Sequence, residues 1–127
     1  MMAVDTSALV AVLAAEPEAR TCELALRDEP DLLISAGTIS EALIVAAGRG
    51  VLEDMTTLIE GLDMEVVPVT GAAAGRIGKI YARWGKGFHP AGLNFGDCFA
   101  YDVAREHGCP LLFVGNDFSK TDIASAL

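Results

Sequence analysis

Short runs of apolar residues alternate along this chain with longer segments in which apolar side chains recur every three or four positions. The short runs are bounded by polar or turn-forming residues and cover 2–5, 32–35, 65–69 and 110–114. Runs of this length that are apolar at nearly every position are typical of parallel strands buried on both faces of a sheet. Pro68 lacks a backbone N–H, so the third strand should end, or lie at an edge, near this residue.

The segments between the runs predict helices. Their expected ranges are 7–14, 17–27, 39–47, 51–62, 71–84, a helix from Asn94 or Gly96 to about 106, and a short final helix within 119–127. Thr38 or Ser40 is the expected cap of the helix at 39–47, and Thr70 that of the helix at 71–84. Strands that alternate with helices favour an α/β sandwich with a mostly parallel sheet, and the length fits a single domain over residues 1–127.

Composition narrows the class of protein. Of the 127 residues, 52% are hydrophobic and 21% are charged, as in a globular protein. No apolar run reaches the roughly 18 residues of a membrane span. No basic segment leads into an apolar stretch at the N-terminus, so we expect a soluble cytoplasmic protein with no membrane partner. The cysteines Cys22, Cys98 and Cys109 form no C-x-x-C pair, which indicates neither a disulfide framework nor a zinc site.

The formal net charge of −9 argues against a protein that coats nucleic acid through a general positive field. This net charge is compatible with a nuclease that has acidic residues in its active site and basic residues at the rim of the site. A strongly acidic domain of this kind is also suited to a basic partner segment.

Four acidic residues fall where strands end or where the following helices begin. Asp5 ends the first run, Asp117 follows the fourth, and Glu41 and Asp97 lie in the first turns of two expected helices. Because parallel strands end at one edge of a sheet, and the following helices start there, topology brings these carboxylates together. Each one alone is equally well explained as a helix cap or a solvated group. Apolar neighbours surround all four, however, and carboxylates in such surroundings need partners.

Neighbouring carboxylates repel one another unless protons or cations neutralise them. Two carboxylates about 5 Å apart repel by roughly 3 kcal/mol at an effective dielectric of 20. An all-oxygen ligand set favours Mg²⁺ or Mn²⁺ over zinc, and such a site suits phosphodiester hydrolysis. Asp122 is a candidate fifth, peripheral metal ligand, with a cap of the last helix as an equal alternative. Asp102 is expected to be solvated.

The segment 76–86 carries several cations and no acid. Arg76, Lys79 and Arg83 recur at i, i+3 and i+7 and share one helical face, and Lys86 follows in a glycine-rich loop. Aromatic side chains lie among them. Cations interleaved with aromatic rings suit single-stranded RNA, through phosphate contacts and base stacking. The alternative is a solvated helix face with Trp84 in the core.

Several segments together resemble the PIN-domain ribonucleases and, more narrowly, the VapC toxins of bacterial VapBC toxin–antitoxin modules. They are 4–9, the alanine-rich helix around Glu41, 92–99 and 110–118. The resemblance covers essentially the whole chain, and it depends on the order and spacing of the set. It implies a PIN-domain α/β/α sandwich, whose mostly parallel central sheet of about four or five strands is flanked by helices.

The resemblance also implies an activity and a site. A metal-dependent endoribonuclease toxin would use Mg²⁺ or Mn²⁺ and would cut an exposed loop of a structured RNA, such as tRNA or rRNA, to inhibit translation and growth. Its acidic quartet maps onto Asp5, Glu41, Asp97 and Asp117. Thr6 resembles the family residue that supports the first acid by hydrogen bonding, and Asn94 the one shortly before the third. The implied partners are RNA, a second copy of the chain in a homodimer, and a VapB antitoxin whose tail covers the site.

Two other functions are alternatives at this point. An aspartyl-phosphate phosphatase on a similar sheet would use Asp5 as its nucleophile, but it normally has a second acid two residues later, where this chain has Ser7. A catalytically silent RNA- or protein-binding module is the other. The fourth ligand is open as well, since Asn116 precedes Asp117 and Asp122 is a candidate to share its role.

Overall fold

Four parallel strands form the central sheet of the computed structural model, which describes residues 1–127. They are β1 (Met2–Val4), β2 (Leu32–Ser35), β3 (Glu65–Val67) and β4 (Leu111–Leu112), and their order across the sheet is β3-β2-β1-β4. Met2 lies opposite Leu32, Ala3 opposite Leu111, and Ser35 opposite Val67. Each predicted strand is present at its predicted place, although β1, β3 and β4 are shorter than the apolar runs.

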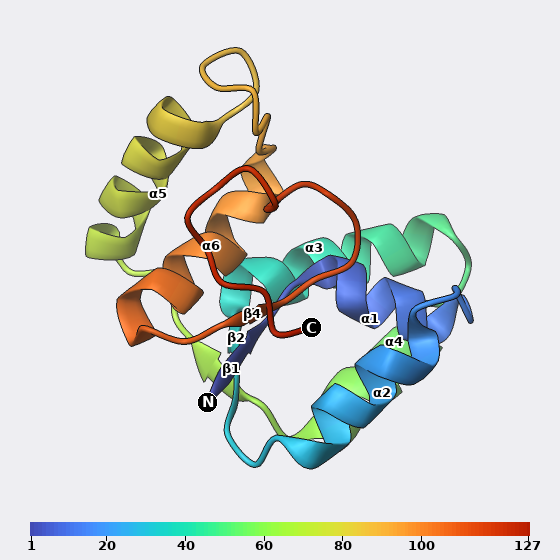
Figure 1. The fold of residues 1–127 in the computed structure, drawn as a ribbon. Helices are drawn as coiled ribbons and strands as arrows, with labels where there is room; N and C mark the ends of the chain where they lie inside the picture. Colours follow the sequence, from blue (N-terminus) through green and yellow to red (C-terminus); the bar gives the residue numbers. More distant parts are fainter.

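Helices cover both faces of this sheet. They are α1 (Thr6–Leu13), α2 (Ala19–Asp28), α3 (Ala36–Gly48), α4 (Leu52–Leu62), α5 (Gly71–Trp84) and α6 (Phe95–His107). Helices α1, α2 and α4 lie together on one side, whereas α5 and α6 lie on the other (Figure 1). The predicted α/β/α sandwich is therefore confirmed. None of these helices combines the length and the apolar character needed to cross a membrane.

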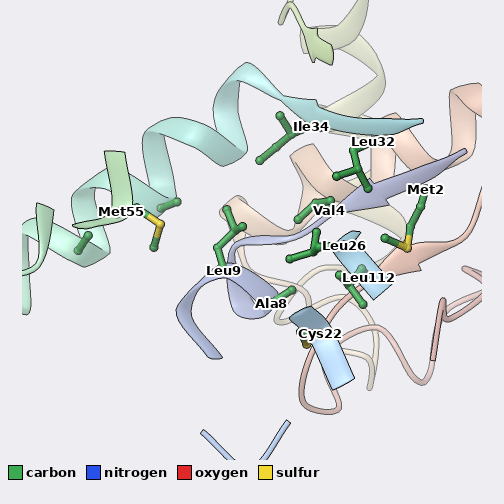
Figure 2. Close-up of a cluster of buried hydrophobic side chains, with 12 residues drawn as sticks. Met2, Val4, Ala8, Leu9, Cys22, Leu26, Leu32, Ile34, Met55 and Leu112 are labelled. Carbon is green, nitrogen blue, oxygen red and sulfur yellow. The ribbon is translucent and has the colours of Figure 1, made fainter. Parts of the chain in front are cut away.

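Alternate strand residues contribute to two separate hydrophobic cores. Met2 and Val4 belong to the first core together with Leu9 of α1, as Figure 2 shows, whereas Ala3 belongs to the second core together with Trp84. Burial on both faces explains why the strands are continuous apolar runs in the sequence. The carboxyl ends of β1 and β2 then pass directly into α1 and α3, with a single residue or none between.

Helix α3 begins earlier than predicted. Its N-cap is Ser35, the last residue of β2, whose hydroxyl oxygen accepts a hydrogen bond from the Gly37 N–H (3.1 Å). Thr38 and Ser40, the predicted caps, therefore lie inside the helix, and Thr38 is fully buried. As a consequence Glu41 lies in the second turn of α3 and not in the first.

The last segment of the chain is not the predicted helix. Beyond β4 the chain forms turns and bends, and Ser125 makes a parallel bridge with Leu111. The Leu111 N–H donates to the Ala124 carbonyl (2.9 Å), and the Ala126 N–H donates to the Leu111 carbonyl (2.9 Å). An edge strand exposes unpaired backbone groups, and here the C-terminal segment satisfies those of β4.

Candidate active site

The first acid is held at the junction of a strand and a helix. Asp5 follows β1 directly and is the N-cap of α1. Its Oδ2 accepts hydrogen bonds from the Ser7 N–H (3.1 Å) and from the Ser7 hydroxyl (2.6 Å). The side chain is buried, and its other oxygen, Oδ1, has no hydrogen-bond partner. Because a buried acceptor without a partner is costly, this oxygen is a favourable position for a cationic ligand.

Ser7 connects the ends of two neighbouring strands. Its Oγ donates to Asp5 and accepts from the Val114 N–H (3.0 Å), two residues beyond β4. The end of β1 is thereby bonded to the segment that leads to Asp117. Ser7 is not among the site residues predicted from the sequence. The sequence feature that could have predicted this role is the Asp-x-Ser spacing at a helix start, because short polar side chains at such positions bond to one another and to the backbone.

Thr6 supports the second acid and not the first. Its Oγ1 donates to Glu41 Oε1 (2.6 Å), and the Thr38 carbonyl is its other close neighbour (3.3 Å). This corrects the role that the family resemblance implies for Thr6, because the residue that bonds Asp5 is Ser7. The reason is the sheet order: β1 and β2 are neighbours, so the helices that follow them start side by side.

The third acid takes part in a reciprocal cap at the start of α6. Asn94 Oδ1 accepts from the Asp97 N–H (3.0 Å), and Asp97 Oδ2 accepts from the Asn94 N–H (3.0 Å). Such a capping box satisfies two backbone donors at once and restricts the acidic side chain. Asp97 Oδ1 lies outside this pair of bonds. Asn94, predicted to act shortly before the third acid, is thus in direct contact with it.

One cleft of about 410 Å³ brings the four predicted acids together. It is lined by Asp5, Glu41, Asp97 and Asp117, by Thr6, Ser7 and Asn94, by Val10, Val45 and Val114, and by Glu16 and Arg49. Asn116 is not among these residues, and Asp117 lies exposed on the turn after β4. No three of the acids are close enough to hold an ion as they stand. The cleft therefore gathers the carboxylates without forming a compact chelate.

The shared cleft raises the pKa of two acids. Burial raises the pKa of Asp5 to about 6, against the opposing effect of its hydrogen bonds from Ser7, and the charge of Glu41 adds to the rise. Burial likewise raises the pKa of Asp97 to about 7, with added effects from the charges of Asp5, Asp117 and Glu41. Raised values of this kind mean that the charged carboxylates lack compensation in the protein alone.

Asp122 lies outside this cleft, so the suggestion that it is a fifth metal ligand is not supported. Its Oδ1 accepts from the Tyr101 hydroxyl (2.5 Å) and its Oδ2 from Arg105 (2.7 Å). These bonds, first of all the one from Tyr101, lower the pKa of Asp122. The residue caps no helix either, because none follows it. Its role is to hold the C-terminal segment against α6.

Asp102 is buried, which corrects the expectation that it is solvated. Arg76 binds it in bidentate fashion, from Nε (2.8 Å) and Nη2 (3.1 Å), and also lies 3.4 Å from Glu106. The segment 76–86 has no acid of its own, but α6 supplies two. Asp102 and Glu106 therefore neutralise Arg76 within the fold, which leaves it less available to a phosphate than the sequence predicts.

The other cations of this segment are exposed. Arg83 lies over the ring of Trp84, 4.6 Å from its centroid, and Lys79 and Lys86 are on the surface. Trp84 itself is buried and donates from Nε1 to the Tyr101 hydroxyl (3.1 Å). The tryptophan thus belongs to the core, as the alternative interpretation has it, while three cations stay accessible around it.

Comparison with known proteins identifies the class that this fold and acidic cleft define. Residues 2–124 match the family model described as the PIN domain. The chain is 40% identical to VapC ribonuclease Mb0640 of Mycobacterium bovis, over 98% of this chain and 97% of the relative. It is 41% identical to a Ribonuclease VapC of Mycolicibacterium smegmatis, over 98% of each chain.

Solved structures share the fold at low sequence identity. Mycobacterium tuberculosis VapC20, described as a sarcin–ricin-loop-cleaving toxin, superposes with a TM-score of 0.81 at 18% identity, over 99% of this chain and 98% of the other. A toxin–antitoxin complex from Klebsiella pneumoniae gives a TM-score of 0.70 at 18% identity, over 96% and 93%. The chain therefore belongs to the PIN-domain family and, within it, to the VapC ribonucleases. The predicted resemblance is confirmed.

Proposed function

We propose that the acidic cleft is a Mg²⁺- or Mn²⁺-dependent site that hydrolyses phosphodiester bonds within RNA, as the toxin of a VapBC pair. The observation that carries this proposal is the buried Oδ1 of Asp5, which has no hydrogen-bond partner in a cleft that also contains Glu41, Asp97 and Asp117. A buried carboxylate oxygen needs a partner, and a divalent cation is the partner that several carboxylates share most favourably.

The donor set of the cleft fits a hard divalent cation. Asp5, Glu41, Asp97 and Asp117 offer carboxylate oxygens only, the ligands that Mg²⁺ and Mn²⁺ prefer. The raised pKa values of Asp5 and Asp97 support the same assignment, because a cation would stabilise their charged forms. When bound, the metal supplies an activated water and neutralises charge on the phosphate in the transition state.

The chain's own residues hold the carboxylates in place. One oxygen of each of three acids accepts a hydrogen bond from a neighbouring residue. Ser7 bonds Asp5 Oδ2, Thr6 bonds Glu41 Oε1, and the Asn94 N–H bonds Asp97 Oδ2. In each case the second oxygen of the carboxylate accepts no hydrogen bond from the protein. Carboxylates that are oriented before the metal arrives lose less conformational freedom on binding it, so these bonds should strengthen metal affinity.

The substrate that we propose is an exposed single-stranded loop of tRNA or rRNA, whose cleavage would inhibit translation and growth. The description of VapC20 as a toxin that cleaves the sarcin–ricin loop supports a target of this class. On this chain, Lys79, Arg83 and Lys86 are the exposed cations that we assign to RNA phosphates, with Arg76 as a minor contributor because Asp102 neutralises it.

The partners that we propose are a VapB-type antitoxin and a second copy of the chain. A structural neighbour described as a toxin–antitoxin complex supports the first. The second is supported by an apolar groove of about 710 Å³ that adjoins the acidic cleft at Glu41 and Val45. Ile44 and Phe95 line this groove and are 72% and 67% exposed. Large exposed apolar side chains in one patch are typical of interaction surfaces.

The two rival functions have less support. A phosphatase of this kind normally has a second acid two residues after its nucleophile, whereas this chain has Ser7 there, and the Ser7 N–H and hydroxyl both bond Asp5 Oδ2. A silent binding module has no use for buried acids whose charged forms lack compensation, because they destabilise the fold.

Cleavage of RNA by antitoxin-free protein tests the proposed function. Wild type should cut total RNA with Mn²⁺ or Mg²⁺, and a chelator should stop the reaction. Asp5→Asn should abolish cleavage. Asp28→Asn, the same change at an exposed position outside the cleft, should leave cleavage intact. Folded wild type that cuts nothing, or Asp5→Asn protein that cuts as well as wild type, contradicts the proposal.

A further inference from the structure

A single cation lies among the acids of the cleft. The cleft is lined by five acidic residues, Asp5, Glu16, Glu41, Asp97 and Asp117, and Arg49 is its only basic residue. Arg49 takes part in none of the ion pairs of the protein, whereas Arg76 and Arg105 are both paired with nearby acids. An exposed guanidinium beside so many carboxylates, yet bonded to none, is available to a ligand.

Arg49 lies about two helical turns beyond Glu41 along α3. Glu41, Val45 and Arg49 recur every four positions, so they follow one stripe of α3 and its C-cap, and all three line the cleft. Eight residues of α-helix span about 12 Å. The cleft therefore extends along α3 from Glu41 to Arg49. The Arg49 N–H bonds the carbonyls of Val45 (3.2 Å) and Ala46 (3.1 Å), which holds the backbone at this point.

The surroundings of Arg49 would otherwise repel an anion. The last turn of a helix carries partial negative charge, and Arg49 is the C-cap of α3. Glu16 lines the same cleft from the connection between α1 and α2, where Ala15 has a left-handed φ of 50°. Without Arg49 the charged side chains of the cleft would present only negative charge to an RNA strand.

We propose that Arg49 binds a phosphate of the RNA strand that flanks the scissile one. This inference rests on the proposed ribonuclease function and adds a second phosphate subsite to it. A strand whose scissile phosphate lies at the acids continues along the cleft, and its neighbouring phosphates need a cation of their own. The planar guanidinium matches a phosphate with two parallel hydrogen bonds, and its charge is not neutralised within the fold.

Binding of a fluorescein-labelled single-stranded RNA tests the subsite. All proteins carry Asp5→Asn, so that the RNA stays intact, and Arg49→Gln is compared with Arg20→Gln, an exposed arginine outside the cleft. We expect Arg49→Gln to weaken binding about tenfold, and the slope of log K against log salt to fall by about 0.7, the value for one phosphate contact on a single strand. Arg20→Gln should change neither.

Neutral methylphosphonate linkages locate the phosphate. Each RNA carries one such linkage, at a different position on either side of the cleavage site. At one position the linkage should weaken binding to the protein that keeps Arg49 as much as Arg49→Gln weakens binding to unmodified RNA. At that position the two changes should not add, since both remove the same contact. Glu16→Gln should tighten binding by relieving repulsion.

Two results would overturn the inference. One is unchanged affinity in Arg49→Gln. The other is an Arg49→Gln protein that binds RNA more weakly but keeps the salt slope, shows additive losses at every linkage and has a lower melting temperature. That combination would show that Arg49 has a structural role and does not contact a phosphate. If wild type cuts RNA with Mn²⁺ while either result is found, only the second subsite is wrong. If wild type neither cuts nor binds RNA, the proposed function is wrong and the subsite with it.

Discussion

The carboxylate of Glu41 lies directly against the Cα of Gly96. Glu41 projects from α3, and Gly96 precedes Asp97 at the start of α6; a Cβ atom at position 96 would overlap the carboxylate. One turn away the two helices exchange roles, because there the ring of Phe99 of α6 lies against Gly37 of α3. One glycine on each helix therefore lets α3 and α6 approach closely enough to place Glu41 and Asp97 in the same cleft.

Gly96→Ala should displace the Glu41 carboxylate and remove most of the activity. Thr6 holds this carboxylate from the other side, so the added methyl group cannot be accommodated without movement. Overpacking of this kind costs about 1–3 kcal/mol. We expect RNA cleavage to fall by about tenfold or more, measured on a labelled RNA, together with a lower melting temperature.

Gly75→Ala is the matched control for this change. Gly75 lies on α5, and nothing lies within 4 Å of a Cβ atom there. The same substitution should stabilise the protein by about 0.5–1 kcal/mol, since alanine is the better helix former, and should leave cleavage unchanged. Full activity in Gly96→Ala would show that the close approach of the two helices is not needed.

The gathering of the acids was predictable from the sequence, whereas the glycine contacts were not. A short apolar run that ends in Asp5, and a helix start that contains Asp97, are local patterns. The rule that parallel strands end at one edge then brings such acids together, without knowledge of any side-chain contact. The contact of Gly96 with Glu41 depends on how α3 crosses α6, and nothing local to either segment specifies that crossing.

The same distinction explains the corrections. Arg76 and Asp102 are 26 residues apart and meet only because α5 and α6 pack together. Asp122 resembles a ligand or a cap in the sequence, but Tyr101 and Arg105 reach it across the fold. Ser125 pairs with the edge of β4, and nothing in the composition of segment 119–127 predicts this pairing.

Ser7→Ala should destabilise the protein and raise the pKa of Asp5 further. The serine hydroxyl bonds both Asp5 and the Val114 N–H, and its hydrogen bond is one of the effects that hold this pKa down. A part-buried donor left without a partner costs about 1–3 kcal/mol. Denaturant unfolding measures the first effect, and an NMR titration of the Asp5 carboxyl measures the second.

Ser40→Ala is the control for this loss of a hydroxyl. Ser40 is exposed, and its hydroxyl bonds only the Ala36 carbonyl of its own helix. Its replacement should change stability by less than about 0.5 kcal/mol. Equal effects of the two substitutions would mean that the bridge between the strand ends adds nothing.

In the presence of a chelator, the contribution of Asp5 and Asp97 to stability should fall as the pH rises. Their pKa values in the folded protein are about 6 and about 7, above the ordinary value of 3.8, so the native state holds protons that the unfolded chain releases. Their contribution is therefore greatest below about pH 4 and is lost as the pH passes through 6 and 7. The total is on the order of a few kcal/mol.

Urea unfolding between about pH 4.5 and 7.5 measures the Asp5 part of this effect as the difference between wild type and Asp5→Asn, because the titration of groups that both proteins share cancels. Wild type should lose stability relative to the variant as the pH rises, and Mg²⁺ should reverse the loss. Asp28→Asn should follow wild type throughout. A wild type that gains stability relative to Asp5→Asn over this range would contradict the raised pKa.

Ile44→Asp should convert the homodimer that we propose to a monomer. Ile44 is the most exposed large apolar side chain, and the groove beside it also contains Phe95 and Val69. A buried charge without a partner disfavours association. Sedimentation should show a halved mass, whereas Leu52→Asp, an exposed apolar position outside the groove, should stay dimeric. A wild type that is monomeric at high concentration would exclude this use of the groove.

Asp117→Asn and Asp122→Asn should separate metal binding from folding. Asp122 holds Tyr101 and Arg105, so its loss should lower the melting temperature but leave the stabilisation by Mg²⁺ intact. Asp117 is exposed in the cleft, and its charge raises the pKa of Asp97, so its loss should change metal-free stability little. It should, however, shrink the Mg²⁺ effect, which is about 2.7 kcal/mol at a metal concentration 100 times Kd. Melting temperatures over a Mg²⁺ series distinguish the two, and the reverse result would make Asp122 the fourth ligand.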